Sequence, residues 1–224
     1  MSRWATFDCY GTLIDWNAGI GGVLEQLYGA ERAPTLLRRY HELEPEVQAE
    51  EYRTYTEVLA LTLERLANEV GYGIPEGEGG ALSHSLPGWP PYPEVPKALE
   101  ELRRRGWRLA VLSNIDHALV VESEKRLGVP FDLIVTAEEV KSYKPAHAHW
   151  ERFFDKSTAV RARHVHVAAS LFHDVEPAKE LGLKTVWISR GGADSFAHTA
   201  RSKPDRELVD LSELPETLDE LVPA

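Results

Sequence analysis

Polar side chains stand where the apolar runs of this sequence end. These residues are Asp8 after the first run, Ser113 and Asn114 at the end of the second, Lys144 in the loop after the third, and Ser170 and Asp174 after the fourth. In an open parallel sheet, ligands bind beyond the carboxyl ends of the strands. We therefore expect a carboxylate, a hydroxyl and amide pair, a lysine and a second carboxylate to converge on one crevice.

Each of these residues also has a purely structural interpretation. An aspartate after a strand often forms a turn or caps a helix, which applies to both Asp8 and Asp174. Ser113 and Asn114 could start a helix, and a single lysine in a loop is usually solvated. Their occurrence at successive strand ends, in order, favours the functional interpretation.

The elements that would position these residues alternate along the chain. Short apolar runs are followed by amphipathic stretches, and this pattern predicts an α/β fold with a parallel sheet. The strand-like runs are residues 4–8, 107–114, 131–136, 164–169 and 184–189. The helix-like stretches between them stop at Gly106, Gly128 and Gly182, as helices commonly do. Residues 208–222 predict an edge strand and a last helix.

One region breaks this alternation. Residues 16–86 show helical periodicity and no convincing strand; a glycine-rich stretch (73–80) lies near the end of this region and a proline-rich stretch (86–96) ends it. The simplest account is a helical insertion after the first strand, with the chain re-entering the core near Pro93. We therefore predict an α/β core formed by residues 1–15 and 91–224 and a helical domain formed by residues 16–90.

Composition and charge exclude several classes of partner. The chain has 224 residues, 43% of them apolar and 27% charged, which is typical of a globular protein. Its net charge of -11 argues against nucleic acid or an anionic membrane as a partner. No apolar run approaches the roughly 20 residues of a membrane-spanning helix, and the first residues lack the apolar stretch of a signal peptide. The single cysteine, Cys9, excludes an internal disulfide, so we expect a cytoplasmic protein.

The motifs at the strand ends resemble those of the haloacid dehalogenase superfamily. Residues 7–15 (FDCYGTLID) resemble the first signature, whose first aspartate is the nucleophile, and residues 112–114 (LSN) resemble the second motif. Lys144 and Pro145 resemble the third motif, and residues 170–182 resemble the fourth. The resemblance covers nearly the whole predicted core in the correct order. It implies a Rossmann-like parallel sheet with an inserted α-helical cap.

Two features resemble the L-2-haloacid dehalogenase type within this superfamily. Tyr10 stands where phosphatase members carry an aspartate that protonates an alkoxide leaving group; a halide leaves without a proton. In the predicted cap, residues 39–44 (RYHELE) resemble the dehalogenase segment whose arginine holds the substrate carboxylate, a task suited to a bidentate guanidinium. The resemblance thus assigns the substrate carboxylate to Arg39. The alternatives are that Arg39 is solvated, or that the adjacent Arg38 faces the site.

The resemblance implies a two-step hydrolysis that needs no cofactor. Asp8 would attack the halogenated carbon of a small 2-substituted carboxylic acid, and water would then hydrolyse the aspartyl ester. Lys144 would keep Asp8 ionised, and Asp174 would hold Lys144 or help activate the water. The groups that would hydrogen-bond the carboxylates and the developing charge are Thr12, Ser113 and Asn114.

The sequence departs from the dehalogenase pattern in the third and fourth motifs. Ala168, Ala169 and Ser170 stand where the fourth motif usually reads Ser-Ser-Asn, and the acid follows one residue later than usual. His173 could then serve as a substitute base. Trp150 replaces the usual tyrosine after the lysine of the third motif, which gives an N–H but no acceptor. The residues expected to bind the substrate are Tyr10, Arg39, Trp150, Ser170 and His173.

Other functions fit the same residues. A Mg²⁺-dependent phosphatase would use Asp8 and Asp174 as metal ligands, although Ala169 takes the usual place of a further acid. A non-catalytic binding protein could keep the same fold, and the two alanines keep that alternative open. Leu59 and Leu63 in the predicted cap could serve either a homodimer interface or the interior of the cap.

Overall fold

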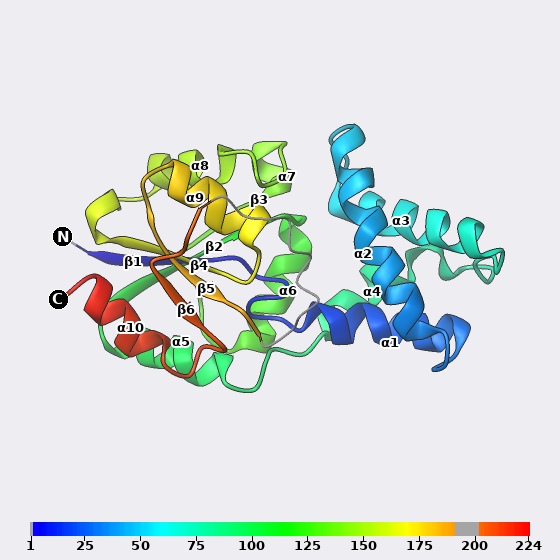
Figure 1. Cartoon of the computed structure of the whole chain (residues 1–224), viewed down its shortest axis with the longest axis horizontal. Helices are drawn as coiled ribbons and strands as arrows, with labels where there is room; N and C mark the ends of the chain where they lie inside the picture. Colours follow the sequence, from blue (N-terminus) through cyan, green and yellow to red (C-terminus); the bar gives the residue numbers. More distant parts are fainter. Residues whose placement is uncertain (1, 191–201) are drawn as a thin grey trace.

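A parallel sheet forms the centre of the larger lobe, with its strands in the order β3-β2-β1-β4-β5-β6 (Figure 1). The computed structural model describes residues 2–190 and 202–224. Its strands are β1 (Arg3–Phe7), β2 (Trp107–Ser113), β3 (Leu133–Thr136), β4 (His164–Ala168), β5 (Lys184–Ile188) and β6 (Arg206–Leu208). The strands predicted from the apolar runs and the α/β class are confirmed, whereas the edge strand β6 lies just before the range expected for it and shares only Leu208 with that range.

Helices cover both faces of this sheet because successive side chains of a strand point to opposite sides. On one face, Ala5 and Phe7 of β1 belong to a large buried apolar cluster that includes the helices of that face. On the other face, Trp4 of β1 packs with Trp150 and Phe153. The helices of the first face are α5 (Val95–Arg104), α6 (His117–Leu127) and α10 (Leu214–Leu221), and those of the second face are α8 (Ala148–Lys156) and α9 (Glu176–Glu180).

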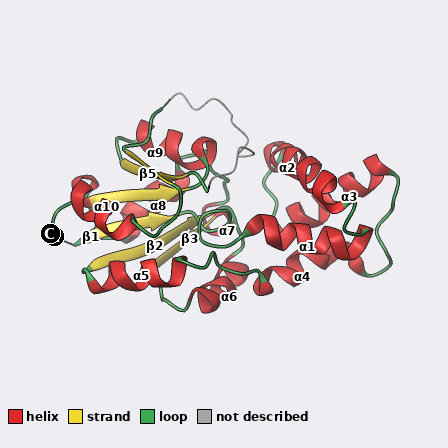
Figure 2. Cartoon of the chain, turned by 60° about the horizontal axis from the view of Figure 1, so that its bottom comes forward, coloured by secondary structure: helices red, strands yellow, loops and turns green. Residues whose placement is uncertain are grey.

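A second lobe consists of helices that lie beyond the carboxyl ends of the strands (Figures 1 and 2). We call residues 16–88 the cap. Its helices are α1 (Trp16–Tyr28), α2 (Ala33–Glu50), α3 (Tyr55–Val70) and α4 (Ala81–Ser85), with short 3-10 helices at Glu78–Gly80 and Leu86–Gly88. Leu59 and Leu63 of α3 are fully buried within this chain. These two leucines therefore serve the interior and not a dimer interface.

The two segments that join the cap to the core lie side by side. Ile14 pairs with Pro91, and the Asp15 backbone N–H donates to the Pro90 carbonyl at 2.8 Å. Asp15 also begins α1, because its carboxylate accepts a hydrogen bond from the Ala18 N–H at 2.9 Å. The cap thus begins directly after the first sequence motif. Among residues 2–190 and 202–224, none of the helices combines the length and apolar character needed to cross a membrane.

Candidate active site

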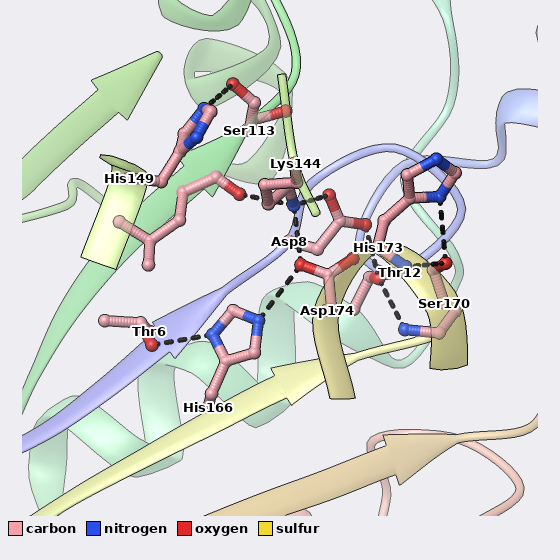
Figure 3. A network of polar contacts seen from close by, with 12 residues as sticks. Thr6, Asp8, Thr12, Ser113, Lys144, His149, His166, Ser170, His173 and Asp174 are labelled. Carbon is pink, nitrogen blue, oxygen red and sulfur yellow. Dashed lines mark hydrogen bonds and ion pairs between the residues drawn. The ribbon is translucent and has the colours of Figure 1, made fainter. Parts of the chain in front are cut away.

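The ammonium group of Lys144 lies between two buried carboxylates (Figure 3). Its Nζ donates to Asp8 Oδ1 at 2.9 Å, to Asp174 Oδ1 at 2.6 Å and to the Leu112 carbonyl at 2.8 Å. These contacts use all three donors of the ammonium. The structure thus brings together the residues that end the first strand, follow the third and follow the fourth, as the sequence predicts.

A tight turn after β1 holds the Asp8 carboxylate. The Leu13 N–H donates to the Cys9 carbonyl at 2.7 Å, and Gly11 in this turn has a φ of 87°, which strongly favours glycine. The turn brings the Thr12 hydroxyl to Asp8 Oδ2, to which it donates at 2.7 Å. Thr12 Oγ1 in turn accepts from the Ala169 N–H at 2.9 Å. Both oxygens of Asp8 are therefore fixed, one by Lys144 and one by Thr12.

Asn114 positions the backbone of Lys144. Its Oδ1 accepts from the Lys144 N–H at 2.7 Å and its Nδ2 donates to the Lys144 carbonyl at 3.1 Å. The sequence suggested that Asn114 would bond the carboxylates, whereas the structure turns its amide to the lysine-bearing loop. Ser113 is buried at the end of β2, and its carbonyl lies 3.2 Å from His149 Nε2. Burial, with the nearby Lys144 charge, lowers the pKa of His149 to about 3, so this ring is neutral and donates to the carbonyl.

The extra residue of the fourth motif is accommodated by a π-helical turn. This turn spans Leu171–Val175, and the Val175 N–H reaches the Ser170 carbonyl five residues back at 3.2 Å. Such turns often result from one inserted residue and are frequent at functional sites. The wider turn keeps Asp174 directed to Lys144 despite the longer spacing.

Charge and burial act against each other in this cluster. Burial raises the pKa of Asp8, and the Lys144 ammonium opposes that shift. Burial alone would also raise the pKa of Asp174, but the Lys144 ammonium and the hydrogen bond to His166 more than offset it and lower the pKa to about 2. Burial would lower the pKa of Lys144, yet the two carboxylates raise it above its ordinary value. The lysine is therefore firmly protonated and Asp174 firmly ionised at neutral pH.

Ser170 and His173 form a hydrogen-bonded pair that begins one residue after Ala169, whose backbone contacts Thr12. Ser170 follows Ala169, whose N–H bonds Thr12, and Ser170 Oγ accepts from the His173 N–H at 3.0 Å. The same hydroxyl lies 3.1 Å from His173 Nδ1. Ser170 therefore begins the π-helical turn and orients the ring of His173.

The side chain of Tyr10 points toward helix α6. Its hydroxyl lies 2.7 Å from Ser123 Oγ of α6, and its ring meets Trp89 edge to face at 6.2 Å between centroids. The ring is partly buried among these groups. The hydroxyl is therefore engaged by the protein and not turned outward to a ligand.

Two residues expected to bind substrate are placed elsewhere. Trp150 is fully buried, on the apolar face of α8 together with Phe153, and its ring meets the edge of His166 at 5.2 Å. It offers no surface to a ligand. The Arg39 guanidinium binds Glu69 through Nε and Nη2, at 2.7 and 2.8 Å, and Glu42 through Nη1 at 2.7 Å. These ion pairs hold Arg39 on the exposed surface of the cap, which corrects the expectation that it faces the site.

The sequence reading missed a buried histidine of the cluster. His166 Nε2 lies 3.0 Å from Asp174 Oδ1, and His166 Nδ1 lies 2.8 Å from Thr6 Oγ1 (Figure 3). The signal was present in the alternation HVHVAA of residues 164–169, which puts His164 and His166 on one face of β4. The partners of His166 on that face are Thr6 of β1 and Asp174 of the π-helical turn, and both become neighbours only in the folded protein.

Comparison with known proteins agrees with this geometry. Residues 6–188 match the model of the haloacid dehalogenase-like hydrolase family. The (S)-2-haloacid dehalogenase of Pseudomonas sp. (strain YL) is 29% identical over 210 residues, which cover 92% of this chain and 89% of that protein. The haloacetate dehalogenase H-2 of Moraxella sp. (strain B) is 28% identical over 191 residues, 83% of this chain and 85% of that protein.

Solved structures share the fold of this chain. The L-2-haloacid dehalogenase from Xanthobacter autotrophicus superposes with a TM-score of 0.84 at 19% identity, covering 97% of this chain and 98% of that one. This likeness shows a common fold. Since the family model runs from the end of the first strand through the whole cap and the fourth motif, the assignment rests on most of the chain. The chain therefore belongs to the haloacid dehalogenase-like hydrolases.

Proposed function

We propose that this protein hydrolyses small 2-haloalkanoic acids through a covalent ester on Asp8. The observation that carries the proposal is the Lys144 ammonium bridging the carboxylates of Asp8 and Asp174. A lysine in this place keeps a buried carboxylate charged, as a nucleophile must be. The curated relatives that match nearly the whole chain are haloacid dehalogenases, which points to the same reaction class.

Asp8 is the better candidate nucleophile of the two carboxylates. The Asp8 side chain is 12% exposed, whereas that of Asp174 is 1% exposed and bonded to Lys144 and His166. A substrate can therefore reach Asp8 and not Asp174. We assign Asp174 the task of holding Lys144.

The proposed reaction has two displacements. A carboxylate oxygen of Asp8 attacks C2 of the substrate, the new C–O bond forms, and the halide leaves with the electron pair of the broken bond. Water then attacks the carbonyl carbon of the Asp8 ester. Cleavage of the acyl C–O bond restores the Asp8 carboxylate and releases a 2-hydroxy acid and one proton. Lys144 and Thr12 hydrogen-bond the two oxygens of Asp8. Ser170 and His173 follow Ala169, whose N–H donates to Thr12.

A phosphatase is the second candidate function. The glyceraldehyde 3-phosphate phosphatase of Methanocaldococcus jannaschii is 37% identical, but only over 106 residues, which is 45% of each chain. A Mg²⁺ ion needs several free oxygen ligands, and Lys144 already contacts one oxygen of each of Asp8 and Asp174. Within residues 2–190 and 202–224, no group of three or more His, Cys, Asp or Glu side chains is arranged to hold a metal ion. The residues that are present therefore favour the dehalogenase.

A single turnover in ¹⁸O-labelled water tests the proposal. With enzyme in excess over 2-chloropropionate, the label should enter the Asp8 carboxylate, because water attacks the ester carbonyl of the protein. The first product should then contain unlabelled oxygen from Asp8. Label that enters the product directly would contradict an ester on Asp8. Phosphate release that requires Mg²⁺, without halide release from any 2-haloacid, would favour the phosphatase.

A further inference from the structure

A row of hydrogen-bonded groups runs through the buried face of the sheet and ends at the active site. His164 Nε2 lies 2.8 Å from Thr6 Oγ1, and Thr6 Oγ1 lies 2.8 Å from His166 Nδ1. His166 Nε2 then lies 3.0 Å from Asp174 Oδ1, the oxygen that also accepts from Lys144. Thr6, His164 and His166 are fully buried. No solvent molecule therefore competes for these contacts.

The direction of these hydrogen bonds follows from counting protons. Asp174 is ionised and can only accept, so His166 carries a proton on Nε2. Thr6 has one hydroxyl proton for two histidine neighbours, so it donates to one ring and accepts from the other. Burial lowers the pKa of His164 well below its ordinary value, so this ring carries a single proton, on Nε2 or on Nδ1.

The buried Nδ1 of His164 decides between the two arrangements. Among the residues that the structure describes, this atom has no hydrogen-bond partner. If His166 were an imidazolium, its Nδ1–H would donate to Thr6, Thr6 would donate to His164 Nε2, and the His164 proton would sit on the unpartnered Nδ1. A buried N–H donor without a partner is rarer and more costly than a buried lone pair. The favoured arrangement runs from His164 Nε2–H to Thr6, and from the Thr6 hydroxyl to His166 Nδ1.

From this arrangement we propose that His166 is a neutral positioning residue, fixed as its Nε2–H tautomer, which holds Asp174 against Lys144. It does not contact the reacting atoms itself. Its catalytic consequence rests on the proposed function, since Lys144 in turn holds Asp8. The structural part of the proposal, the tautomer and the bond to Asp174, stands without any assumption about substrate.

Several charged or titratable groups face His166 and bear on this assignment. Asp174 meets its Nε2 from the π-helical turn, with Lys144 and Asp8 directly behind, and His164 precedes it on β4. His149 of α8 is near enough to interact electrostatically. The remaining neighbour on that side is the uncharged ring of Trp150. Asp174 is thus the only anion in direct contact with His166 among the described residues, and it can hold a neutral N–H as well as a cation.

Nitrogen NMR of the ¹⁵N-histidine-labelled protein tests the tautomer without any substrate. At neutral pH the ring of His166 should show a protonated Nε2 and an unprotonated Nδ1, and His164 should show the same pattern. Comparison with His166→Gln assigns the signals. Two protonated nitrogens on His166 near pH 7, or a proton on Nδ1 alone, would overturn the assignment. Failure of every dehalogenase assay would leave this result untouched, so the two proposals fail separately.

Substitution of His166 tests the positioning role. His166→Phe removes the donor while filling the space beside Trp150, and His166→Gln can still donate an amide N–H to Asp174. Since loss of a hydrogen bond to a charged group reduces the corresponding equilibrium by roughly 10- to 150-fold, we expect kcat to fall within this range in His166→Phe, with KM nearly unchanged. The acid limb of kcat/KM should move to higher pH, because Asp174 loses a donor that favours its ionised form.

His166→Gln should recover most of the lost rate and the original pH profile. His147→Phe serves as the control for removal of a histidine and should change neither, because His147 is half-exposed at the start of α8 and contacts only Glu180 among the hydrogen-bonded groups described for its side chain. A His166→Phe protein that folds normally and keeps both kcat and the wild-type acid limb would overturn the positioning role. If His166→Phe fails to fold, the NMR measurement on the wild-type protein still decides the bond to Asp174.

Discussion

Asp116 of the core accepts a hydrogen bond from the backbone N–H of Tyr55, the first residue of cap helix α3, at 2.7 Å. The other oxygen of Asp116 accepts from the N–H and the hydroxyl of Thr56, at 2.9 and 2.7 Å. Asp116 itself stands at the start of α6, beyond the end of β2. A carboxylate is stabilised at a helix N-terminus by the free N–H groups and the helix dipole. A side chain of the core thus caps the N-terminus of a helix in the cap domain.

We expect Asp116→Ala to loosen the attachment of the cap to the core. The matched control is Thr54→Ala, because Thr54 caps the same helix from within the cap. Each substitution should cost about 0.5–2 kcal/mol of stability, the usual value for an N-cap. Only Asp116→Ala should also raise KM, since it alone breaks a contact between the two lobes. Steady-state kinetics and hydrogen exchange of residues 54–58 measure both effects.

Equal effects of both variants on KM would contradict this interpretation of Asp116. In that case the carboxylate would matter only as a helix cap. A second contact between the lobes, in which the Tyr143 hydroxyl donates to the Arg53 carbonyl at 3.0 Å, allows an independent check. Tyr143→Phe removes this contact and should change KM in the same direction as Asp116→Ala.

Asp8→Asn should abolish turnover while leaving the fold intact. The amide is nearly the same size as the carboxylate but is a poor nucleophile, so we expect a loss of more than about 10³ in kcat. The thermal unfolding midpoint should remain within a few degrees, because Asn can still accept from Lys144. Halide release by the variant, set against circular dichroism of the same preparation, checks both statements. Activity near that of the wild type would exclude Asp8 as the nucleophile.

Arg39→Ala should leave KM for 2-haloacids within about twofold of the wild type. Its guanidinium is bound to Glu69 and Glu42 on a half-exposed surface, and exposed ion pairs of this kind contribute about 1 kcal/mol or less. Arg38→Ala is the matched control on the same helix. If Arg39→Ala instead raised KM roughly 10- to 150-fold, as loss of a charge-assisted substrate contact would, Arg39 would have to leave both glutamates when substrate binds.

The positions of Asp8, Lys144 and Asp174 could be predicted because parallel strands deliver their carboxyl ends to one edge. That rule needs only the order of apolar runs and polar residues, both of which the sequence contains. The extra residue before Asp174 could be counted in the sequence. The π-helical turn that accommodates this residue could not be predicted, because it depends on the position of Lys144 in the folded core, which Asp174 contacts.

The errors concern which way a side chain points. Trp150 follows the third motif at a suggestive spacing, but its place on the apolar face of α8, three residues before Phe153, buries it. Arg39 has a glutamate three residues later on its own helix and another on α3, and the second becomes a neighbour only when the two helices pack. His166 was missed for the same reason, since its partners Thr6 and Asp174 belong to other elements. Side-chain contacts between elements that are distant in the sequence depend on how those elements pack, so no local sequence pattern predicts them.

Glu44→Gln should stabilise the protein at high pH and not at low pH. Glu44 is buried in the cap, where its carboxylate accepts from the Tyr55 hydroxyl at 2.7 Å and from Gln48 Nε2 at 3.1 Å. Burial raises its pKa from 4.5 to about 7, although these hydrogen bonds oppose the shift. The folded state therefore binds this proton more tightly than the unfolded state does. Stability must fall as the pH rises from about 4.5 to about 7, and level off above that.

A neutral glutamine can accept the same hydrogen bonds and carries no charge to desolvate. Because one pKa unit corresponds to about 1.4 kcal/mol, the advantage of Glu44→Gln over the wild type should grow by about 2–3 kcal/mol between pH 5 and pH 8. Urea unfolding of both proteins at the two pH values measures this difference. Glu46→Gln, at an exposed position of the same helix, should show no such change. An advantage that is equal at both pH values would mean that Glu44 is not protonated in the folded protein at pH 5, and that burial does not control its charge.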